Sequence, residues 1–137
     1  MRRFARYVMF LVPLAAVGCG GIKQSAERKK AQNDLKELGI AYITYQDTNQ
    51  KPPKSLDELV AFAQKSGSPL SSGVIRLSVV WGAGMAGLCR DGAASEVVIA
   101  SAPASGGLVP VLMADGSVRT MNQKEYDGAK KATPLNR

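Results

Sequence analysis

The sequence predicts an α+β domain in which an N-terminal amphipathic helix packs on a small antiparallel sheet and a short second helix follows the first. Two observations support this prediction. Apolar residues recur at steps of three and four over residues 25–47, which is the period of a helix with one buried face. After residue 73 the pattern changes to short β-branched and aliphatic runs bounded by turn residues, which is typical of strands.

The first helix is expected over residues 25–47. Its apolar stripe consists of Ala31, Leu35, Leu38, Tyr42 and Tyr45. Ile40 and Ile43 are expected to widen this stripe, while polar and charged side chains occupy the opposite side. Gly39 lies in the middle of the helix, where glycine costs roughly 1 kcal/mol relative to alanine, so we expect it to permit close packing against a strand.

A polar turn and two prolines separate the first helix from the second. Pro52-Pro53 cannot continue a helix, because neither residue has an amide hydrogen. Ser55 and Glu58 have the spacing of a capping box, in which each side chain accepts a hydrogen bond from the other residue's backbone amide. The second helix is therefore expected over residues 56–65, and Gly67 is expected to end it.

The second half of the chain is expected to be mainly strands and turns. The expected strands are residues 74–81, 96–100, 108–113 and 117–121. Asp115-Gly116 is suited to the positive φ angles of a two-residue hairpin turn between the last two strands. A short helix is expected to begin near Asn122, which has the capping spacing with Glu125, and residues 133–137 are expected to form a flexible tail.

The N-terminus has the features of a bacterial lipoprotein signal. Three arginines precede an apolar run over residues 8–14, and small residues occupy positions 15–18, directly before Cys19. The four residues Ala16-Val17-Gly18-Cys19 resemble a lipobox, with alanine where leucine is usual. The resemblance implies cleavage between Gly18 and Cys19 and attachment of acyl chains to Cys19.

Two other interpretations of this segment remain open, namely an ordinary secretory signal with an unrelated cysteine and an uncleaved anchor. The apolar run is shorter than the roughly 20 residues that a membrane-spanning helix needs. On the lipoprotein interpretation, residues 1–18 are the signal peptide, 19–24 a lipidated tether, 25–132 the globular domain and 133–137 the tail. Gly20 follows the cysteine, which favours the outer membrane in organisms that sort lipoproteins by that residue.

Composition excludes several classes of function. The formal charge is +7, and without the leader's three arginines fifteen basic side chains oppose eleven acidic ones. This excess is scattered except at Arg28-Lys29-Lys30 and Lys130-Lys131. Two interpretations of these clusters remain open, namely a solvated helix face and a contact with anionic lipid or a wall polymer. Nucleic acid is not expected as a partner. Histidine is absent, which removes Ser-His and Cys-His catalytic pairs, so we expect neither enzymatic activity nor a cofactor.

Residues 82–87, Gly-Ala-Gly-Met-Ala-Gly, match the G-x-G-x-x-G pattern of dinucleotide-binding loops. That function is not expected, because the pattern requires a helix after its third glycine and an acidic residue at the end of the next strand. Neither is present in the sequence. The glycine-rich loop of residues 82–94, together with Trp81, is nevertheless the candidate surface for binding a wall polymer or small ligand.

Asp91, Asp115 and Asp127 each precede a glycine. Turn formation explains this pattern, and calcium binding is the alternative, with Asp115 the weak metal candidate. Calcium requires six or more oxygen ligands, and no Asp-x-Asp-x-Asp spacing supplies them.

Because an acylated Cys19 leaves Cys89 without an intramolecular partner, Cys89 is expected to be a small buried residue, with a free thiol or an intermolecular bridge as alternatives.

Residues 33–53 resemble the part of type II secretion major pseudopilins, and of related pilin-like proteins, that follows their membrane anchor. That family combines a helix rich in leucine, alanine and tyrosine, a polar turn, a proline and a Ser-Leu-x-x-Leu element, which here is residues 55–59. One branch also ends in a strand-turn-strand with Asp-Gly, as in residues 111–119. This chain has a lipobox in place of the prepilin peptidase site and lacks the branch's histidine, so the resemblance implies a pilin-like fold and nothing further.

Together these features predict a lipid-anchored protein of the cell envelope with a noncatalytic structural or assembly role. The expected partners are membrane lipid, through acylated Cys19, and envelope or secretion-system proteins. The alternative function is an envelope binding module for a wall polymer or small ligand.

Overall fold

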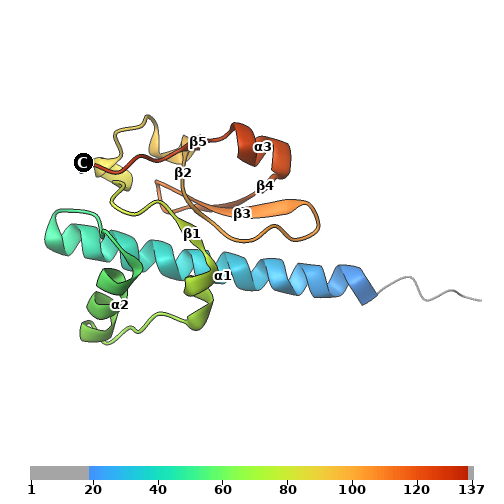
Figure 1. Cartoon of the computed structure of the whole chain (residues 1–137), viewed down its shortest axis with the longest axis horizontal. Coiled ribbons are helices and arrows are strands. Elements are labelled where there is room, and N and C mark those ends of the chain that lie inside the picture. The colour runs from blue at the N-terminus through green and yellow to red at the C-terminus, as the bar shows by residue number, and fades with distance from the viewer. Residues whose placement is uncertain (1–18, 136–137) are drawn as a thin grey trace, which may run out of the picture.

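The computed structural model describes residues 19–135 and has the predicted α+β class. A long helix, α1 (Cys19–Asn49), lies along one side of a small sheet, and a shorter helix, α2 (Leu56–Lys65), packs beside it (Figure 1). The sheet consists of β1 (Ser78–Val79), β2 (Val97–Ser101), β3 (Leu108–Met113), β4 (Val118–Asn122) and β5 (Lys130–Lys131). A third helix, α3 (Gln123–Gly128), connects β4 to β5.

The sheet is antiparallel along the order β1-β2-β3-β4, and β5 adds a short parallel pairing with β2. β1 and β5 pair with different ends of β2, since Ser78 is opposite Ser101 whereas Lys130 is opposite Val97. β2 and β3 are therefore the central strands. Every residue of β2, and all of β3 except its first residue, is buried.

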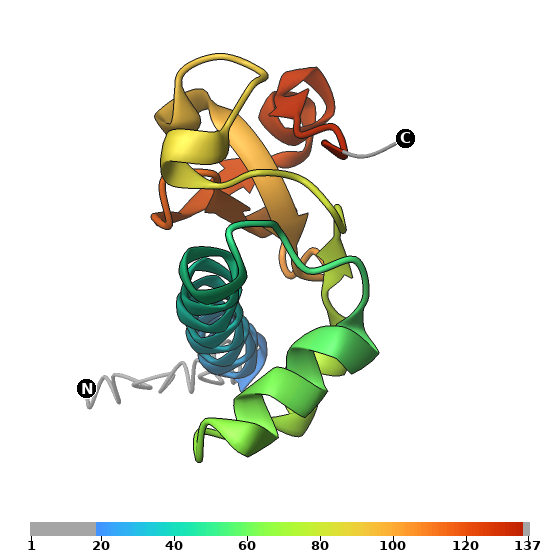
Figure 2. The same ribbon diagram turned by 90° about the vertical axis from the view of Figure 1, so that its left-hand side faces the viewer.

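β2 and β3 are buried because helices cover both faces of the sheet (Figure 2). On the face toward α1, Leu112 and Ala114 join the larger core, whereas Val109, Val111 and Met113 join a smaller core on the other face. Tyr126 of α3 packs against this second core. Such double burial explains the nearly continuous apolar sequence of these strands, which shows little alternation.

The buried face of α1 is largely the predicted one. Leu35, Leu38 and Tyr42 are completely buried. A β-carbon on Gly39 would lie 2.9 Å from Leu112 Cδ1, so the predicted close packing of this glycine against a strand is confirmed. The prediction for Ile40 is wrong: its side chain is 71% exposed, because the 100° turn per residue carries it away from the sheet that Gly39 faces.

The second helix has the predicted bounds, but its N-terminal hydrogen bonds differ from a capping box. Ser55 Oγ accepts from the Glu58 amide at 3.2 Å, as expected, whereas Glu58 Oε2 accepts from the Lys54 amide at 2.7 Å. Its other carboxylate oxygen accepts the hydroxyl of Tyr45. Gly67 ends the helix with a φ of 76°, which is the left-handed conformation typical of this position.

Two segments after α2 differ from their predictions. The expected strand over residues 74–81 is a short 3₁₀ helix, η1 (Ser72–Arg76), followed by the two-residue strand β1. The last hairpin does not have a two-residue turn, because Gly116 has a positive φ of 88° and Asp115 does not. The Gly116 amide donates to the Met113 carbonyl at 3.0 Å, which makes a three-residue connection.

The ends of the described chain are more ordered than the sequence predicts. Helix α1 begins at Cys19 rather than near residue 25, so the segment expected to be a tether is helical. The first part of the expected tail is bound to the domain, because the Leu135 amide donates to the Gly82 carbonyl at 2.7 Å. The expected start of α3 is confirmed, with a complete capping box between Asn122 and Glu125.

Candidate functional site

Cys19, the predicted acylation site, is the first residue of α1. Its side chain, Gly18 and the predicted signal peptide over residues 1–18 lie outside the described residues. From Cys19 the helix continues without interruption to Asn49, a length of about 46 Å at 1.5 Å per residue. Its first turns extend beyond the sheet (Figure 1), and residues 20–24 are exposed.

The glycine-rich loop, the predicted binding surface, begins inside the protein. Gly82, Ala83, Gly84 and Met85 are buried. The side-chain amide of Gln46 pairs with the backbone of Met85, donating to its carbonyl and accepting from its amide at 2.9 Å each. Gly84 therefore serves close packing, since a β-carbon there would collide with the Leu88 carbonyl.

Trp81 likewise belongs to the interior contacts. Its ring stacks on Tyr42 with 6.1 Å between the ring centroids and an angle of 19°. The Tyr42 hydroxyl donates to the Ala83 carbonyl at 2.8 Å, and burial raises the pKa of this hydroxyl above its ordinary value. Trp81 and Tyr42 thus hold the glycine-rich loop against α1.

The three aspartates next to glycines occupy separate hydrogen-bonding positions. Asp115 Oδ1 accepts from the amide and hydroxyl of Ser117 at 2.9 and 2.6 Å, and these bonds lower the pKa of the Asp115 carboxyl. Asp91 accepts from Thr133, and Asp127 from the side chain of Gln123. Turn formation accounts for Asp115, and among residues 19–135 no three potential metal-ligating side chains cluster at one point.

Within the described part of the chain, Glu58 and Tyr45 form the one contact between two side chains that both have a shifted pKa. The Tyr45 hydroxyl donates to the carboxylate, which lowers the pKa of Glu58, while burial and the adjacent negative charge raise the pKa of Tyr45 to about 12. Phe62 packs edge-on against the Tyr45 ring, with 5.2 Å between the centroids. This pair joins α1 to the start of α2, which is a structural role.

Cys89 is half-buried and packs against the larger core. Its thiol makes no disulfide within the described residues. The expectation of a small buried residue is met only in part, because Cys89 contacts the core but is not fully buried.

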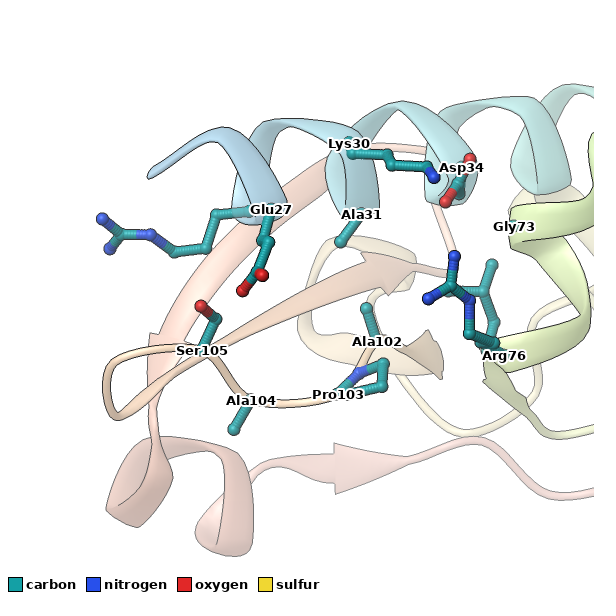
Figure 3. Close-up of a pocket in the computed structure, with 12 residues that line it drawn as sticks. Glu27, Lys30, Ala31, Asp34, Gly73, Arg76, Ala102, Pro103, Ala104 and Ser105 are labelled. Atoms are coloured by element: carbon teal, nitrogen blue, oxygen red, sulfur yellow. The ribbon is translucent and has the colours of Figure 1, made fainter. Parts of the chain in front are cut away.

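A polar groove of about 470 Å³ between α1 and the sheet was not predicted (Figure 3). Asp34 and Lys30 line it from α1, Arg76 from η1, and residues 102–105 from the segment after β2. The Arg76 guanidinium points toward α1, and the Glu27 carboxylate points toward Ser105. Because three segments distant in sequence form the groove, no local motif could have indicated it.

Searches of protein-family models, curated proteins and solved structures find no significant match to this chain. Among residues 19–135, no helix combines the length and apolar character needed to cross a bilayer. The candidate sites are the predicted acylation site at Cys19, the exposed first turns of α1 and the polar groove.

Proposed function

We propose that this chain is a lipid-anchored protein of the cell envelope with a noncatalytic structural or assembly role. The observation that carries the proposal is the sequence up to Cys19, with its basic start, short apolar run and small residues directly before the cysteine. Acylation at Cys19 would attach the domain to the bilayer, firmly where two or more acyl chains are present.

The position of Cys19 at the start of α1 supports this proposal. A helix of 31 residues connects Cys19 directly with the larger core, to which Leu35, Leu38 and Tyr42 contribute. A continuous helix transmits the orientation of its anchored end to the domain, whereas a flexible tether would not. Such a domain would present a defined surface to other envelope components, which suits an assembly role.

The environment of the acidic groups supports a noncatalytic role. Among residues 19–135, the carboxylates with lowered pKa values, Glu58, Asp91 and Asp115, each accept a hydrogen bond from a side-chain hydroxyl, and each accepts a second one from a backbone amide. These bonds stabilise the charged form of each carboxyl group, and a general acid at neutral pH requires the opposite shift. Histidine is absent from the sequence.

The anchor is tested by metabolic labelling with a fatty-acid analogue in a bacterial host. The chain has two cysteines, so Cys19→Ser removes the proposed site and Cys89→Ser is the matched control. We expect label on the unchanged chain and on Cys89→Ser, and none on Cys19→Ser. Label that persists on Cys19→Ser, or its absence from all three proteins, would contradict the anchor.

The assembly role is tested by crosslinking in cells followed by purification of the lipidated chain. We expect envelope or secretion-system proteins to be recovered with the native chain at higher yield than with Cys19→Ser. Recovery of the chain alone would count against an assembly role and leave the anchor in place.

An envelope binding module is the second candidate function, because the groove combines acidic and basic side chains. Asp34 and Arg76 supply opposite charges to its lining, which suits a polar ligand such as a wall polymer fragment. Thermal-shift measurements with soluble envelope glycans test this function. We expect stabilisation that Arg76→Gln abolishes and Arg119→Gln, a change outside the groove lining, retains.

A further inference from the structure

One side of α1 is covered by neither the sheet nor α2 (Figure 2). A stripe of exposed residues runs along the helix and ends at Ile40, which borders a hollow between α1 and α2. The stripe consists of Ile22, Ala26, Lys29, Asn33, Lys36 and Ile40, all exposed. Their spacing of four, three, four, three and four residues places them on one face of the helix. The stripe spans about 27 Å at 1.5 Å per residue.

The composition of the stripe differs from that of an ordinary solvated helix face. Ile22 and Ile40 are 77% and 71% exposed and are two of the large apolar side chains left uncovered among the described residues. Lys29 and Lys36 lie between them, and the stripe itself carries no acidic residue. Apolar ends around basic side chains are typical of helices that lie in the interface of an anionic bilayer.

The neighbouring charges favour the same partner. Lys23 and Lys30 are exposed beside the stripe. Residues 19–40 of α1 carry three acidic side chains, Glu27, Asp34 and Glu37, against five basic ones, Lys23, Arg28, Lys29, Lys30 and Lys36. The exposed side of this half of α1 is therefore basic and complements anionic phospholipid headgroups.

We propose that this stripe lies on anionic phospholipid headgroups, so that α1 rests along the membrane surface to which Cys19 is attached. The proposal extends the proposed function, since it assumes a membrane location. A second copy of the chain fits less well, because the central lysines of two such stripes would repel each other in a helix pair. The sheet and the polar groove would then face away from the bilayer or along it.

The test uses residues 19–137 with Cys19→Ser, which removes acylation. This chain keeps both cores, whose residues lie between positions 31 and 132. Sedimentation with vesicles measures its binding to phosphatidylcholine alone and to an equimolar mixture with phosphatidylglycerol. We expect binding to the anionic vesicles that falls as salt is added, and no binding to the neutral ones.

Substitutions locate the contact. Lys29→Gln with Lys36→Gln should weaken binding to the anionic vesicles about 30-fold, because each lysine near such a surface contributes roughly fivefold. Lys51→Gln with Lys65→Gln, two exposed lysines away from the stripe, is the matched control and should leave binding unchanged. Ile22→Ser should weaken binding with no change in charge.

Several results would overturn the proposal: equal binding to both kinds of vesicle, no binding to either, or equal losses in the stripe and control variants. A dimer in sedimentation equilibrium that Lys29→Gln with Lys36→Gln strengthens would instead assign the stripe to self-association. Vesicle binding is measured without acylation, so the two experiments are independent. A negative vesicle result would not affect the labelling result at Cys19, and a negative labelling result would not affect the vesicle result.

Discussion

Asp91 shows how a single side chain orders the C-terminal segment. Its two carboxylate oxygens accept from the amide and the hydroxyl of Thr133, at 2.9 and 2.6 Å. The nearby Leu135 amide donates to the Gly82 carbonyl, which brings the segment against the glycine-rich loop. The hydrogen bonds from Thr133 lower the pKa of the Asp91 carboxyl below its usual 3.8, chiefly through the Thr133 hydroxyl.

Asp91→Asn is expected to lower stability at neutral pH by at most about 1 kcal/mol, since the site is partly exposed to solvent. The pKa of Asp91 is lower in the folded than in the unfolded chain. Its carboxylate therefore contributes fully to the free energy of unfolding above pH 3.8, and this contribution disappears as the pH falls through the pKa of Asp91 in the folded chain. The difference between Asp91→Asn and the unchanged chain should therefore shrink toward zero in acid. Urea unfolding at several pH values measures this difference in the free energy of unfolding.

Asp127→Asn is the control for this experiment, because it removes the same charge from the exposed surface of α3. A difference between Asp91→Asn and the unchanged chain that stays constant from neutral to acid pH would contradict the role of the carboxylate.

The glycine-rich loop shows at the scale of an element why a pattern of glycines can mislead. Gly84 is buried where the Leu88 carbonyl leaves no room for a β-carbon, whereas Gly87 is exposed and has no neighbouring atom in the way. Gly82 has a φ of 75°, a conformation that other residues adopt with strain. These glycines satisfy different requirements of one packed turn, and together they match a nucleotide-binding pattern by spacing alone.

Gly84→Ala is expected to destabilise the protein by about 1–3 kcal/mol, because the added methyl group must displace backbone. Gly87→Ala should be neutral or stabilise by up to about 1 kcal/mol, since its effect is mainly to reduce the freedom of the unfolded chain. Chemical denaturation of the two variants gives the comparison. Equal effects of the two substitutions would show that the loop is not packed as described.

At the scale of the whole molecule, the two cores share their strands. β2 contributes Val97 and Ile99 to the core under α1 and Val98 to the core under α3, and β3 divides its side chains in the same way. Loss of packing on one face therefore disturbs strands that the other face needs. Such a structure is expected to unfold in one cooperative transition.

This cooperativity is testable because Trp81, the single tryptophan, packs against the α1 core. Thermal unfolding followed by tryptophan fluorescence and by far-ultraviolet circular dichroism should give the same midpoint. Leu38→Ala, in the α1 core, should cost about 2–5 kcal/mol, and Val111→Ala, in the other core, should lower the fluorescence midpoint as well. A Trp81 transition that Val111→Ala leaves unchanged would show that the two cores unfold independently.

Much of the fold could be predicted because its signals are local. The bounds of α2, the strands β2 and β3, the start of α3 and the close approach at Gly39 follow from caps, turn residues and apolar periods. The exposure of Ile40 also follows from the helical period, which places it opposite Leu35, Leu38 and Tyr42, so the error there was in applying the period. The replacement of a long first strand by η1 could not be predicted this way, because it depends on where the sheet ends.

The sequence by itself determined the class of the fold and the helical period of α1, and it is also the sole basis of the predicted lipoprotein signal before Cys19, because each of these is a property of neighbouring residues. Only the tertiary structure decided that the first four residues of the glycine-rich loop are buried, that Asp91 binds the C-terminal segment, and that the polar groove and the exposed stripe of α1 exist. These features depend on contacts between segments far apart in the chain, and the packing of one whole element against another decides which side chains remain exposed.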